Sequence, residues 1–257
     1  MSTVSVSLLM ANSLPVNKIL IKSMSISALL GNTNQPFTGT VEIILTNNLP
    51  INISLPSYFP NVEQKTIVVI GALDLHGSYH DITWTRLNRT AVAGSNLLTL
   101  STSVDWQVDD EIIVTTTDAS ITHTERHRII EIVNSTTIRL ANTLAYTHLV
   151  TEQRFSSRNQ QIRVAAAVGL LTHNIRVKSE YPSTSLAGFQ ILVTRSLLNT
   201  NIKGTARLTN VQFIGFGRFN DSRTADKNAG IYMDTLGDSS GITYIDKCSF
   251  DGGYNGA

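Results

Sequence analysis

The 257-residue chain has one cysteine, Cys248, and few charged residues, which make up 15% of the sequence. A single thiol cannot form an internal disulfide and cannot supply a zinc site built from several thiolates. The 20 basic and 19 acidic side chains leave a net charge of +1, so no global field attracts DNA, RNA or an anionic membrane. We therefore expect no nucleic-acid partner.

Long apolar runs and long helical periods are also missing. The most apolar stretch, residues 67–75, holds seven apolar residues, roughly a third of the ~20 apolar residues that a bilayer-spanning helix needs. The amino terminus has no basic region and only a weak apolar core, so it does not predict a secretory signal. We expect membrane contact only through parts of a parent protein outside this chain.

Short β-branched runs bounded by Gly, Asn, Asp and Ser recur along the whole chain and predict an all-β fold. They lie at residues 18–23, 40–45, 66–70, 111–115, 128–133 and 162–164. Turn sequences such as Gly31-Asn-Thr-Asn34 separate these runs. The low charged fraction agrees, because stacked strands expose Ser, Thr and Asn more than Lys and Glu.

A faint internal repeat occupies the last third of the chain. Three segments share its alternation of apolar and polar positions, the first with one extra residue: residues 171–177, 208–215 and 245–252. If each segment is one rung of a β-solenoid, Val211 lies over Cys248 and Phe213 over Phe250, about 4.8 Å apart. Such alternation also arises by chance in β proteins, so the repeat alone leaves a β-sandwich open.

These patterns divide the chain into three segments. Residues 1–83 end in a turn, residues 84–161 have the pattern of a compact antiparallel unit, and residues 162–257 hold the repeated rungs. The last residues, 252–257, contain no polar cap for a solenoid. We therefore expect the chain to be truncated at its carboxyl end.

Several motifs, in order, resemble the G8 domain and the segment that follows it in fibrocystin-like proteins and in the cell-surface hyaluronidase family. They are Gly-Asn-Thr-Asn-Gln-Pro-Phe-Thr-Gly at residues 31–39, Val-Ile-Gly-Ala-Leu-Asp-Leu-His-Gly at residues 69–77, Trp-Thr-Arg-Leu at residues 84–87, and residues 104–112, 144–148 and 167–175. The resemblance covers roughly residue 15 to the end. It implies a β-helical G8 domain that continues into a right-handed parallel β-helix, truncated at both ends.

The same resemblance implies two functions. The first is a non-catalytic binding or adhesion module with a glycan or protein ligand, extracellular or at the cell surface, in a larger secreted or single-pass membrane protein. The alternative is a hyaluronan-depolymerising glycoside hydrolase of the hyaluronidase branch.

One departure from the family pattern favours the binding module. The hyaluronidase-like members carry a His-Phe-His triplet before Leu-Gly-Asp, and alignment on Leu236-Gly-Asp238 puts Tyr232 and Asp234 at the two histidine positions. If the chain were an enzyme, Tyr232, Asp234 and Asp238 would supply its acid and base. The alternative is a polar column on the outer face of a solenoid. A second departure is Asp109 at a turn where the family usually has glycine; aspartate tolerates the left-handed conformation that such a turn requires.

Two clusters resemble metal sites. On a strand, His123, Glu125 and His127 share one face and could hold zinc, although a solvated strand edge is the simpler interpretation. The acidic turn of Asp105, Asp109, Asp110 and Glu111 could attract calcium, but it lacks the spacing of a calcium loop. We therefore expect neither a metal nor another cofactor.

The remaining candidates are surface features. Asp74, His76, His80 and Asp81 lie around a turn, where such residues are common, and receive no function. Four Asn-x-Ser/Thr triplets are glycosylation acceptors if the chain enters the secretory route: Asn52, Asn88, Asn134 and Asn220.

Overall fold

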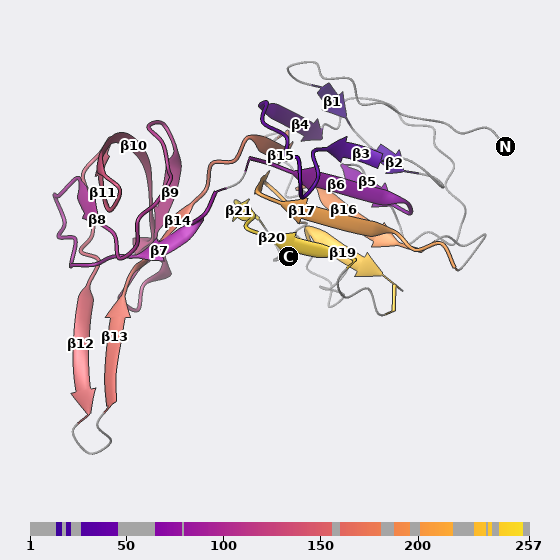
Figure 1. Ribbon diagram of the computed structural model, residues 1–257. Coiled ribbons are helices and arrows are strands. Elements are labelled where there is room, and N and C mark those ends of the chain that lie inside the picture. The colour runs from indigo at the N-terminus through magenta and orange to yellow at the C-terminus, as the bar shows by residue number, and fades with distance from the viewer. Residues whose placement is uncertain are drawn as a thin grey trace. The chain divides into compact units, whose positions relative to one another are not determined.

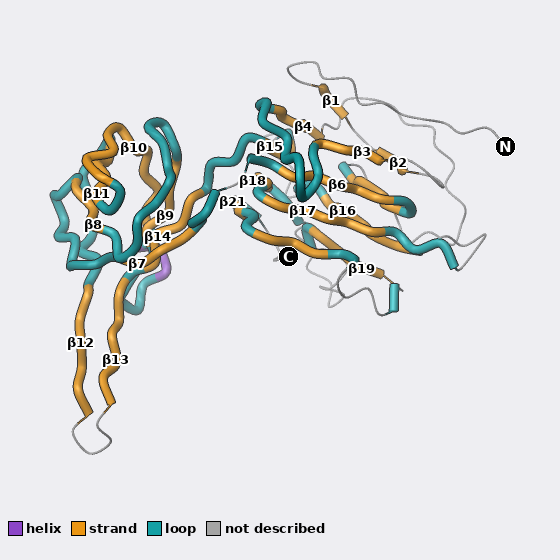
Figure 2. Tube along the Cα trace, viewed as in Figure 1, coloured by secondary structure: helices purple, strands orange, loops and turns teal. Residues whose placement is uncertain are grey.

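The computed structural model describes residues 14–16, 19–21, 27–45, 65–78, 80–155, 160–180, 188–195, 201–217, 229–234, 236–237 and 242–253. The chain forms two compact units, residues 1–79 with 173–257 and residues 80–172. Strands dominate both units, and the one helix within the described residues is a short 3-10 turn, η1 (Ile121–His123) (Figure 2). The predicted all-β fold is confirmed.

The described strands of the first unit form three sheets in which all neighbours are parallel. The first sheet contains β1 (Leu14–Val16), β4 (Val41–Leu45), β15 (Ile175–Ser179), β18 (Val211–Ile214) and β21 (Ser249–Asp251). The second contains β2 (Ile19–Ile21), β5 (Thr66–Val69), β16 (Gln190–Thr194) and β19 (Ile231–Asp234). The third contains β3 (Ser27–Leu30), β6 (Ala72–His76), β17 (Thr205–Thr209) and β20 (Tyr244–Asp246).

Successive strands enter the three sheets in turn, so the chain coils (Figure 1). One coil runs β4, β5, β6, the next β15, β16, β17, and the next β18, β19, β20. Each strand pairs with its counterpart one coil away, as in the ladder that sets Ile175 beside Val41 on one side and Val211 on the other. This arrangement is a β-solenoid, as the repeat predicts.

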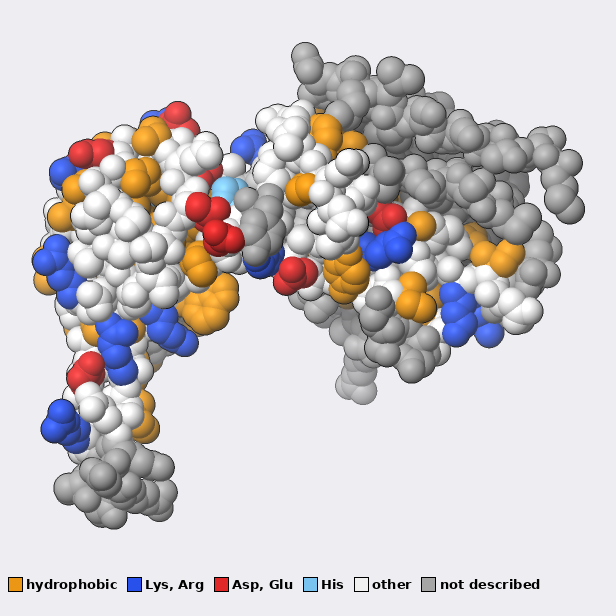
Figure 3. Space-filling view, in the orientation of Figure 1, with side chains coloured by type: hydrophobic (Ala, Val, Ile, Leu, Met, Phe, Trp, Pro, Cys, Tyr) orange, Lys and Arg blue, Asp and Glu red, His pale blue; other side chains and the backbone are white. Residues whose placement is uncertain are grey.

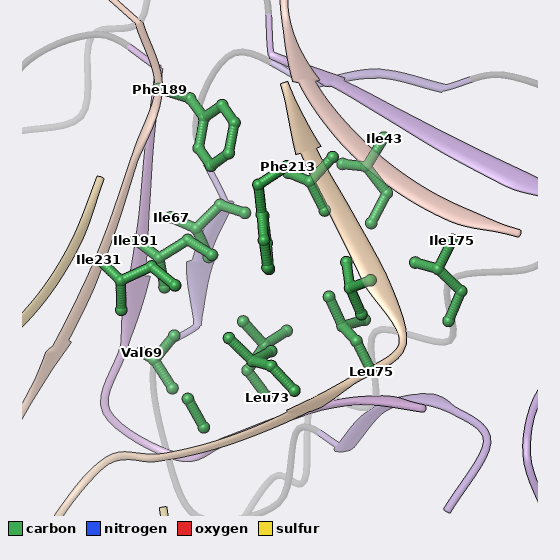
Figure 4. Close-up of a cluster of buried hydrophobic side chains, with 14 of the residues drawn as sticks. Ile43, Ile67, Val69, Leu73, Leu75, Ile175, Phe189, Ile191, Phe213 and Ile231 are labelled. Atoms are coloured by element: carbon green, nitrogen blue, oxygen red, sulfur yellow. The ribbon is translucent and has the colours of Figure 1, made fainter. Parts of the chain in front are cut away.

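Apolar side chains of equivalent positions stack inside the coils. Val177 pairs with Phe213 and Phe213 with Phe250, and the two phenyl rings lie 5.1 Å apart at an interplanar angle of 21°. Figure 4 shows such a column on another sheet, formed by Ile67, Ile191 and Ile231. The predicted stacking of Phe213 and Phe250 in one core is therefore confirmed.

The second unit is antiparallel. Its main sheet has the order β7 (Trp84–Arg86), β14 (Ala167–Leu170), β9 (Glu111–Val114), β10 (Glu125–Asn134), β11 (Thr137–Leu140) and β8 (Leu97–Thr99). A separate hairpin, β12 (Val150–Phe155) with β13 (Gln160–Ala165), projects from this sheet (Figure 1). The core of the unit includes Leu98, Ile112, Ile129 and Trp106, whose indole Nε1 donates to the Ile82 carbonyl over 2.6 Å.

The bounds of the units differ from those expected from the sequence. The antiparallel unit spans residues 80–172 rather than 84–161, and residues 162–164 lie in β13, not in a parallel rung. Alternation of apolar and polar residues identifies a strand but not its partner, and β13 pairs with β12, its neighbour in sequence. Asp109 has φ of 76°, so the aspartate does adopt the left-handed conformation predicted for its turn.

Candidate functional site

A pocket of about 620 Å³ lies in the solenoid unit where β6, β17 and β20 run side by side. Leu73, Leu75, Ala206 and Leu208 of these strands face the core. Because side chains alternate along a strand, the residues between them face outward. The pocket is lined by nine residues of the described part of the chain: Asn32, Thr33, Pro36, His76, Gly77, Thr209, Asn210, Tyr244 and Asp246.

The register of the sheet sets two outward rows at this place. Arg207 pairs with Asp74 on one side and Tyr244 on the other. Thr209 pairs likewise with His76 and Asp246. The alignment of Leu208 with Ile245 in the sequence repeat already contains this register, and the ladder confirms it.

The loop between β3 and β4 forms one wall of the pocket. Gly31 begins it with φ of 77°, and a Cβ there would lie 2.3 Å from the Phe37 nitrogen, so only glycine fits. The Asn32 side chain accepts hydrogen bonds from the backbone of Asn34 and Gln35, both over 2.9 Å. The Phe37 N–H then donates to the His76 carbonyl over 2.8 Å, which ties the loop to the end of β6.

Asn174 holds this loop from the next coil. Its amide nitrogen donates to the carbonyls of Phe37 over 2.8 Å and Gly39 over 2.6 Å. Its amide oxygen accepts the Ser78 N–H over 2.8 Å. One side chain therefore joins the two segments that carry the G8 motifs, residues 31–39 and 69–77.

Gly77 allows the close approach of two coils beside the pocket. A Cβ at this position would meet the Asn210 carbonyl oxygen at 2.2 Å and the Asn174 amide oxygen at 2.7 Å. Backbone atoms cannot move aside at such distances without shifting a strand. The absence of a side chain at Gly77 thus keeps the floor of the pocket in place.

An ion pair lies in the outward row next to the pocket. The Arg207 guanidinium donates from Nε to Oδ1 and from Nη2 to Oδ2 of Asp74, both over 2.6 Å. The Asp74 side chain is 9% exposed and that of Arg207 is 38% exposed. Hydrogen bonding to Asp74 raises the pKa of Arg207, so the pair stays ionised and its two charges cancel locally.

His76 is neutral at the pocket at pH 7. Burial lowers the pKa of its imidazole, the Arg207 charge lowers it further, and the Asp74 charge opposes both. The ring meets Tyr244 edge to face, with centroids 6.2 Å apart and planes at 76°. The lining thus combines apolar surface from Pro36 and Tyr244 with uncharged hydrogen-bonding groups and the exposed carboxylate of Asp246.

The candidate acid–base residues of the hyaluronidase branch lie elsewhere. Tyr232 and Asp234 are on β19, in the second sheet, and Tyr232 packs against Val68, Ile70 and Leu192. Neither residue lines the pocket. Asp238 lies outside the described residues.

The three candidate zinc ligands do not converge. His123 lies in η1, and its Nδ1 contacts Asp118 Oδ2 over 2.6 Å while its ring stacks on Tyr146. This bond is the main cause that lowers the pKa of Asp118 to about 2. Among the residues that the structure describes, no group of three or more His, Cys, Asp or Glu side chains is arranged to hold a metal ion.

Glu125 instead belongs to a polar cluster inside the second unit. Its carboxylate contacts Nε2 of His127 over 3.2 Å and Nε2 of His148 over 3.0 Å, and it accepts the N–H groups of Ala145 and Tyr146. Burial of Glu125 acts against the charge, but these hydrogen bonds together lower the pKa of the carboxyl. The cluster joins β10 to the chain before β12, and no motif or periodicity in the sequence predicts the contact of His148 with Glu125.

The acidic turn does not form a cage of free oxygens. Asp105 accepts the Asp81 N–H and Asp110 accepts the Gln107 N–H. Asp109 pairs with Arg128 over 3.2 Å, and Glu111 pairs with Arg126. These acidic groups therefore make hydrogen bonds and ion pairs within the protein, as expected of a surface turn. On the face in Figure 3, acidic and basic side chains are likewise interspersed.

Two of the four glycosylation triplets lie in the described residues. Asn88 and Asn134 are both exposed. Asn134 stands where β10 turns into β11, and its Oδ1 accepts the hydroxyl and the N–H of Thr136, each over 3.0 Å. Asn52 and Asn220 lie outside the described residues.

Sequence comparison agrees with the motifs that build the pocket. Residues 3–88 match the G8 domain. Human fibrocystin-L is 34% identical over 232 residues, which is 87% of this chain and 5% of that protein. Residues 3–88 thus carry the G8 domain, and the chain is similar to fibrocystin-like proteins over most of its length. Mouse fibrocystin is 29% identical over 158 residues, 61% of the chain and 4% of that protein.

The chain spans about 5% of the length of fibrocystin-L. A G8 domain-containing protein of Dictyostelium discoideum is 25% identical over 195 residues, 75% of the chain and 16% of that protein. Among solved structures, a tailspike of the Acinetobacter baumannii bacteriophage AP22 matches with 11% identity and a TM-score of 0.31, covering 85% of the chain and 34% of the tailspike. At that TM-score the likeness assigns neither a fold nor a ligand.

Most of the pocket carries no recognisable motif in the sequence. His76 stands out there only as part of a polar turn, and Thr209, Tyr244 and Asp246 belong to no motif. The signal was present in the repeat, since aligned rungs place these side chains in common rows.

Proposed function

We propose that this chain is an extracellular or cell-surface binding module and that its pocket takes a sugar unit of a glycan. The observation that carries the proposal is the pocket itself, in which a half-buried tyrosine and a proline stand beside uncharged polar groups and one carboxylate. Ligand pockets commonly combine apolar surface with a few placed polar groups.

The chemistry of these groups fits a sugar ring. Tyr244 presents an apolar ring with a polar tip, which suits the C–H face of a pyranose and its hydroxyls. Thr209 and His76 can each donate or accept a hydrogen bond, the Asn32 amide nitrogen can donate one, and Asp246 accepts from hydroxyls. Each sugar hydroxyl can both donate and accept a hydrogen bond. An uncharged sugar can therefore pair with the donors and acceptors that line the pocket.

We propose binding without cleavage. Glycoside hydrolysis needs an acid and a second carboxylate on opposite sides of the scissile bond. Both carboxylate oxygens of Asp74 accept hydrogen bonds from Arg207, so neither is directed at a ligand in the pocket. Tyr232 and Asp234 belong to a different sheet from the pocket.

The location outside the cell rests on the resemblance to fibrocystin-like proteins and on the exposed acceptors Asn88 and Asn134. No helix among the described residues is long and apolar enough to cross a bilayer. We propose that both asparagines carry glycans when the chain passes through the secretory route. Peptide mass spectrometry before and after glycosidase treatment tests each site, and unmodified Asn134 in secreted protein would contradict this part.

Titration calorimetry tests the pocket directly. The probes are a tetramer of N-acetylglucosamine, a galactose-containing neutral tetrasaccharide and a hyaluronan tetrasaccharide. Binding of at least one probe should weaken more than about tenfold in Tyr244→Ala, because aromatic contacts dominate such pockets. Tyr146→Ala, which removes a tyrosine of the other unit, should leave the affinity unchanged.

Equal affinity in Tyr244→Ala and the wild type would show that the glycan binds elsewhere. Chain length is followed on the same hyaluronan sample, and shortening that disappears in Asp234→Ala would establish the hydrolase instead.

A further inference from the structure

We propose that the pocket selects uncharged sugars against sugars that carry a carboxylate, and that Asp246 determines this specificity. The inference rests on the proposed function and names the class of glycan that the same site accepts. The inference follows from the charges near the pocket: the charges of Asp74 and Arg207 cancel in an ion pair, whereas the charge of Asp246 has no such partner described at the pocket.

The ion pair beside the pocket contributes no net charge. Both carboxylate oxygens of Asp74 accept from Arg207, so the guanidinium offers its Nε and Nη2 to the protein and not to a ligand. Arg207 is also not among the residues that line the pocket. An anionic sugar therefore lacks the bidentate cation that commonly recognises a carboxylate in proteins.

His76 does not replace that cation. Its imidazole is buried within the fold, and it lies in the same outward row as Thr209 and Asp246. Burial and the neighbouring guanidinium favour the neutral ring, which serves as one donor and one acceptor. The neutral ring can therefore form a hydrogen bond with a sugar hydroxyl, and it carries no positive charge that would attract a sugar carboxylate.

Asp246 is the one acidic or basic residue other than His76 among the described residues that line the pocket. It is exposed at the end of β20, and its carboxylate borders the space that a ligand would occupy. A carboxylate only accepts hydrogen bonds. A ligand hydroxyl or amide N–H supplies the matching donor, whereas a ligand carboxylate would face a like charge.

The discriminating experiment uses two probes that differ only at the carboxyl group. They are a hyaluronan tetrasaccharide and the same tetrasaccharide after reduction of its glucuronate carboxyls to hydroxymethyl groups. The wild type should bind the reduced probe at least about tenfold more tightly. The repulsion between two like charges at contact distance is large enough to produce a difference in affinity of this size. Raising the salt concentration should narrow the gap, because an exposed charge is screened.

The decisive variant is Asp246→Asn, which keeps the size of the side chain and removes its charge. In Asp246→Asn the ratio of the two affinities should fall to near one, mainly because the acidic probe binds better. Asp234→Asn, on β19 outside the pocket, should keep the wild-type ratio. Asp246→Ser provides a second neutral variant, and circular dichroism confirms that each variant is folded.

The outcomes separate the two proposals. Equal affinity of the wild type for both probes, or a preference that survives Asp246→Asn and Asp246→Ser, overturns the specificity while Tyr244→Ala still tests glycan binding. Tighter binding of the acidic probe overturns it as well. Failure of the wild type to bind either probe, the N-acetylglucosamine tetramer or the galactose-containing tetrasaccharide overturns both the specificity and the proposed function.

Discussion

At the scale of single residues, burial decides the chemistry of the one thiol. Cys248 packs against the solenoid core, and its Sγ contacts the Leu208 carbonyl over 3.5 Å. Burial raises the pKa of the thiol to about 12, so almost no thiolate is present at pH 8. Cys248 is therefore a partly buried side chain packed against the core, at the position that the predicted rung requires.

Cys248 should react with a disulfide reagent such as 5,5′-dithiobis(2-nitrobenzoate) far more slowly in the native protein than in guanidinium chloride. The expected native rate is at least about a hundredfold lower, because only the thiolate reacts and the core excludes the reagent. Free glutathione under both conditions corrects for the solvent. Equal rates in the folded and unfolded protein would place Cys248 outside the core.

His76 should make the fold sensitive to acid. Its pKa is lowered from 6.5 by burial, so below pH 6.5 the unfolded chain takes up the proton more readily than the folded one. The free energy of unfolding should thus stay constant above pH 6.5. It should fall as the pH drops from 6.5 through the pKa of His76 in the folded protein. Urea unfolding followed by circular dichroism at pH 7.5, 6.5 and 5.5 measures it.

The matched variant His76→Gln should show a smaller fall of the unfolding free energy over that pH range. Glu125, whose pKa is lowered from 4.5, adds a further loss only at lower pH, where its carboxylate must be protonated. An identical pH dependence in His76→Gln and the wild type would contradict the burial of a neutral imidazole.

Residue identity predicted some local conformations and not others. The left-handed turn at Asp109 follows from a short polar side chain at a position that the family fills with glycine. The contact of His148 with Glu125 spans 23 residues of sequence, and no periodicity marks it. Contacts of this kind depend on how the whole unit folds, so a single sequence does not contain a local signal for them.

At the scale of elements, the loop of residues 31–39 depends on a side chain from a distant coil. Asn174 follows the whole second unit in sequence, yet its amide makes three hydrogen bonds to the two segments with the G8 motifs. The motifs alone thus predict the family but not the pocket wall, because the residue that fixes the wall belongs to the next coil.

Asn174→Ala should destabilise the protein by about 1–3 kcal/mol, since it removes three hydrogen bonds and leaves the Phe37 carbonyl with the Ser78 hydroxyl alone. The amides of Phe37 and Ser78 should exchange hydrogen faster than in the wild type. Gln35→Ala, an exposed change in the same loop, serves as the control. Unchanged exchange at Phe37 and Ser78 in Asn174→Ala would refute this role of Asn174.

Strand existence was predicted better than strand pairing. The runs at 40–45 and 66–70 coincide with β4 and β5, and the aligned repeats gave the ladder between β18 and β21. Residues 162–164 were assigned to a rung, whereas they pair within the β12–β13 hairpin. Apolar alternation is the same in both settings, and only the partner strand differs.

At the scale of the whole molecule, the second unit is an insertion between two neighbouring coils. β15 pairs directly with β4, although the entire unit of residues 80–172 separates them in sequence. The two ends of the insertion are close, since the Ser78 N–H bonds the Asn174 side chain over 2.8 Å. Insertions at such sites need little from the surrounding fold.

Replacement of residues 80–172 by a short Gly-Ser linker should therefore leave the solenoid folded. The shortened chain should keep the slow reaction of Cys248 with the thiol reagent and the glycan affinity of the parent. A shortened chain in which Cys248 reacts at the unfolded rate would show that the coils require the inserted unit.

The most direct measurement of the central claim is a nuclear magnetic resonance titration of the ¹⁵N-labelled chain with the N-acetylglucosamine tetramer and the carboxyl-reduced hyaluronan tetrasaccharide. The account predicts that the amide chemical shifts of Gly77, Thr209, Tyr244 and Asp246 change. The amide chemical shifts of the β12–β13 hairpin should stay unchanged. Shifts confined to that hairpin, or no shifts with either sugar at millimolar concentration, would contradict it.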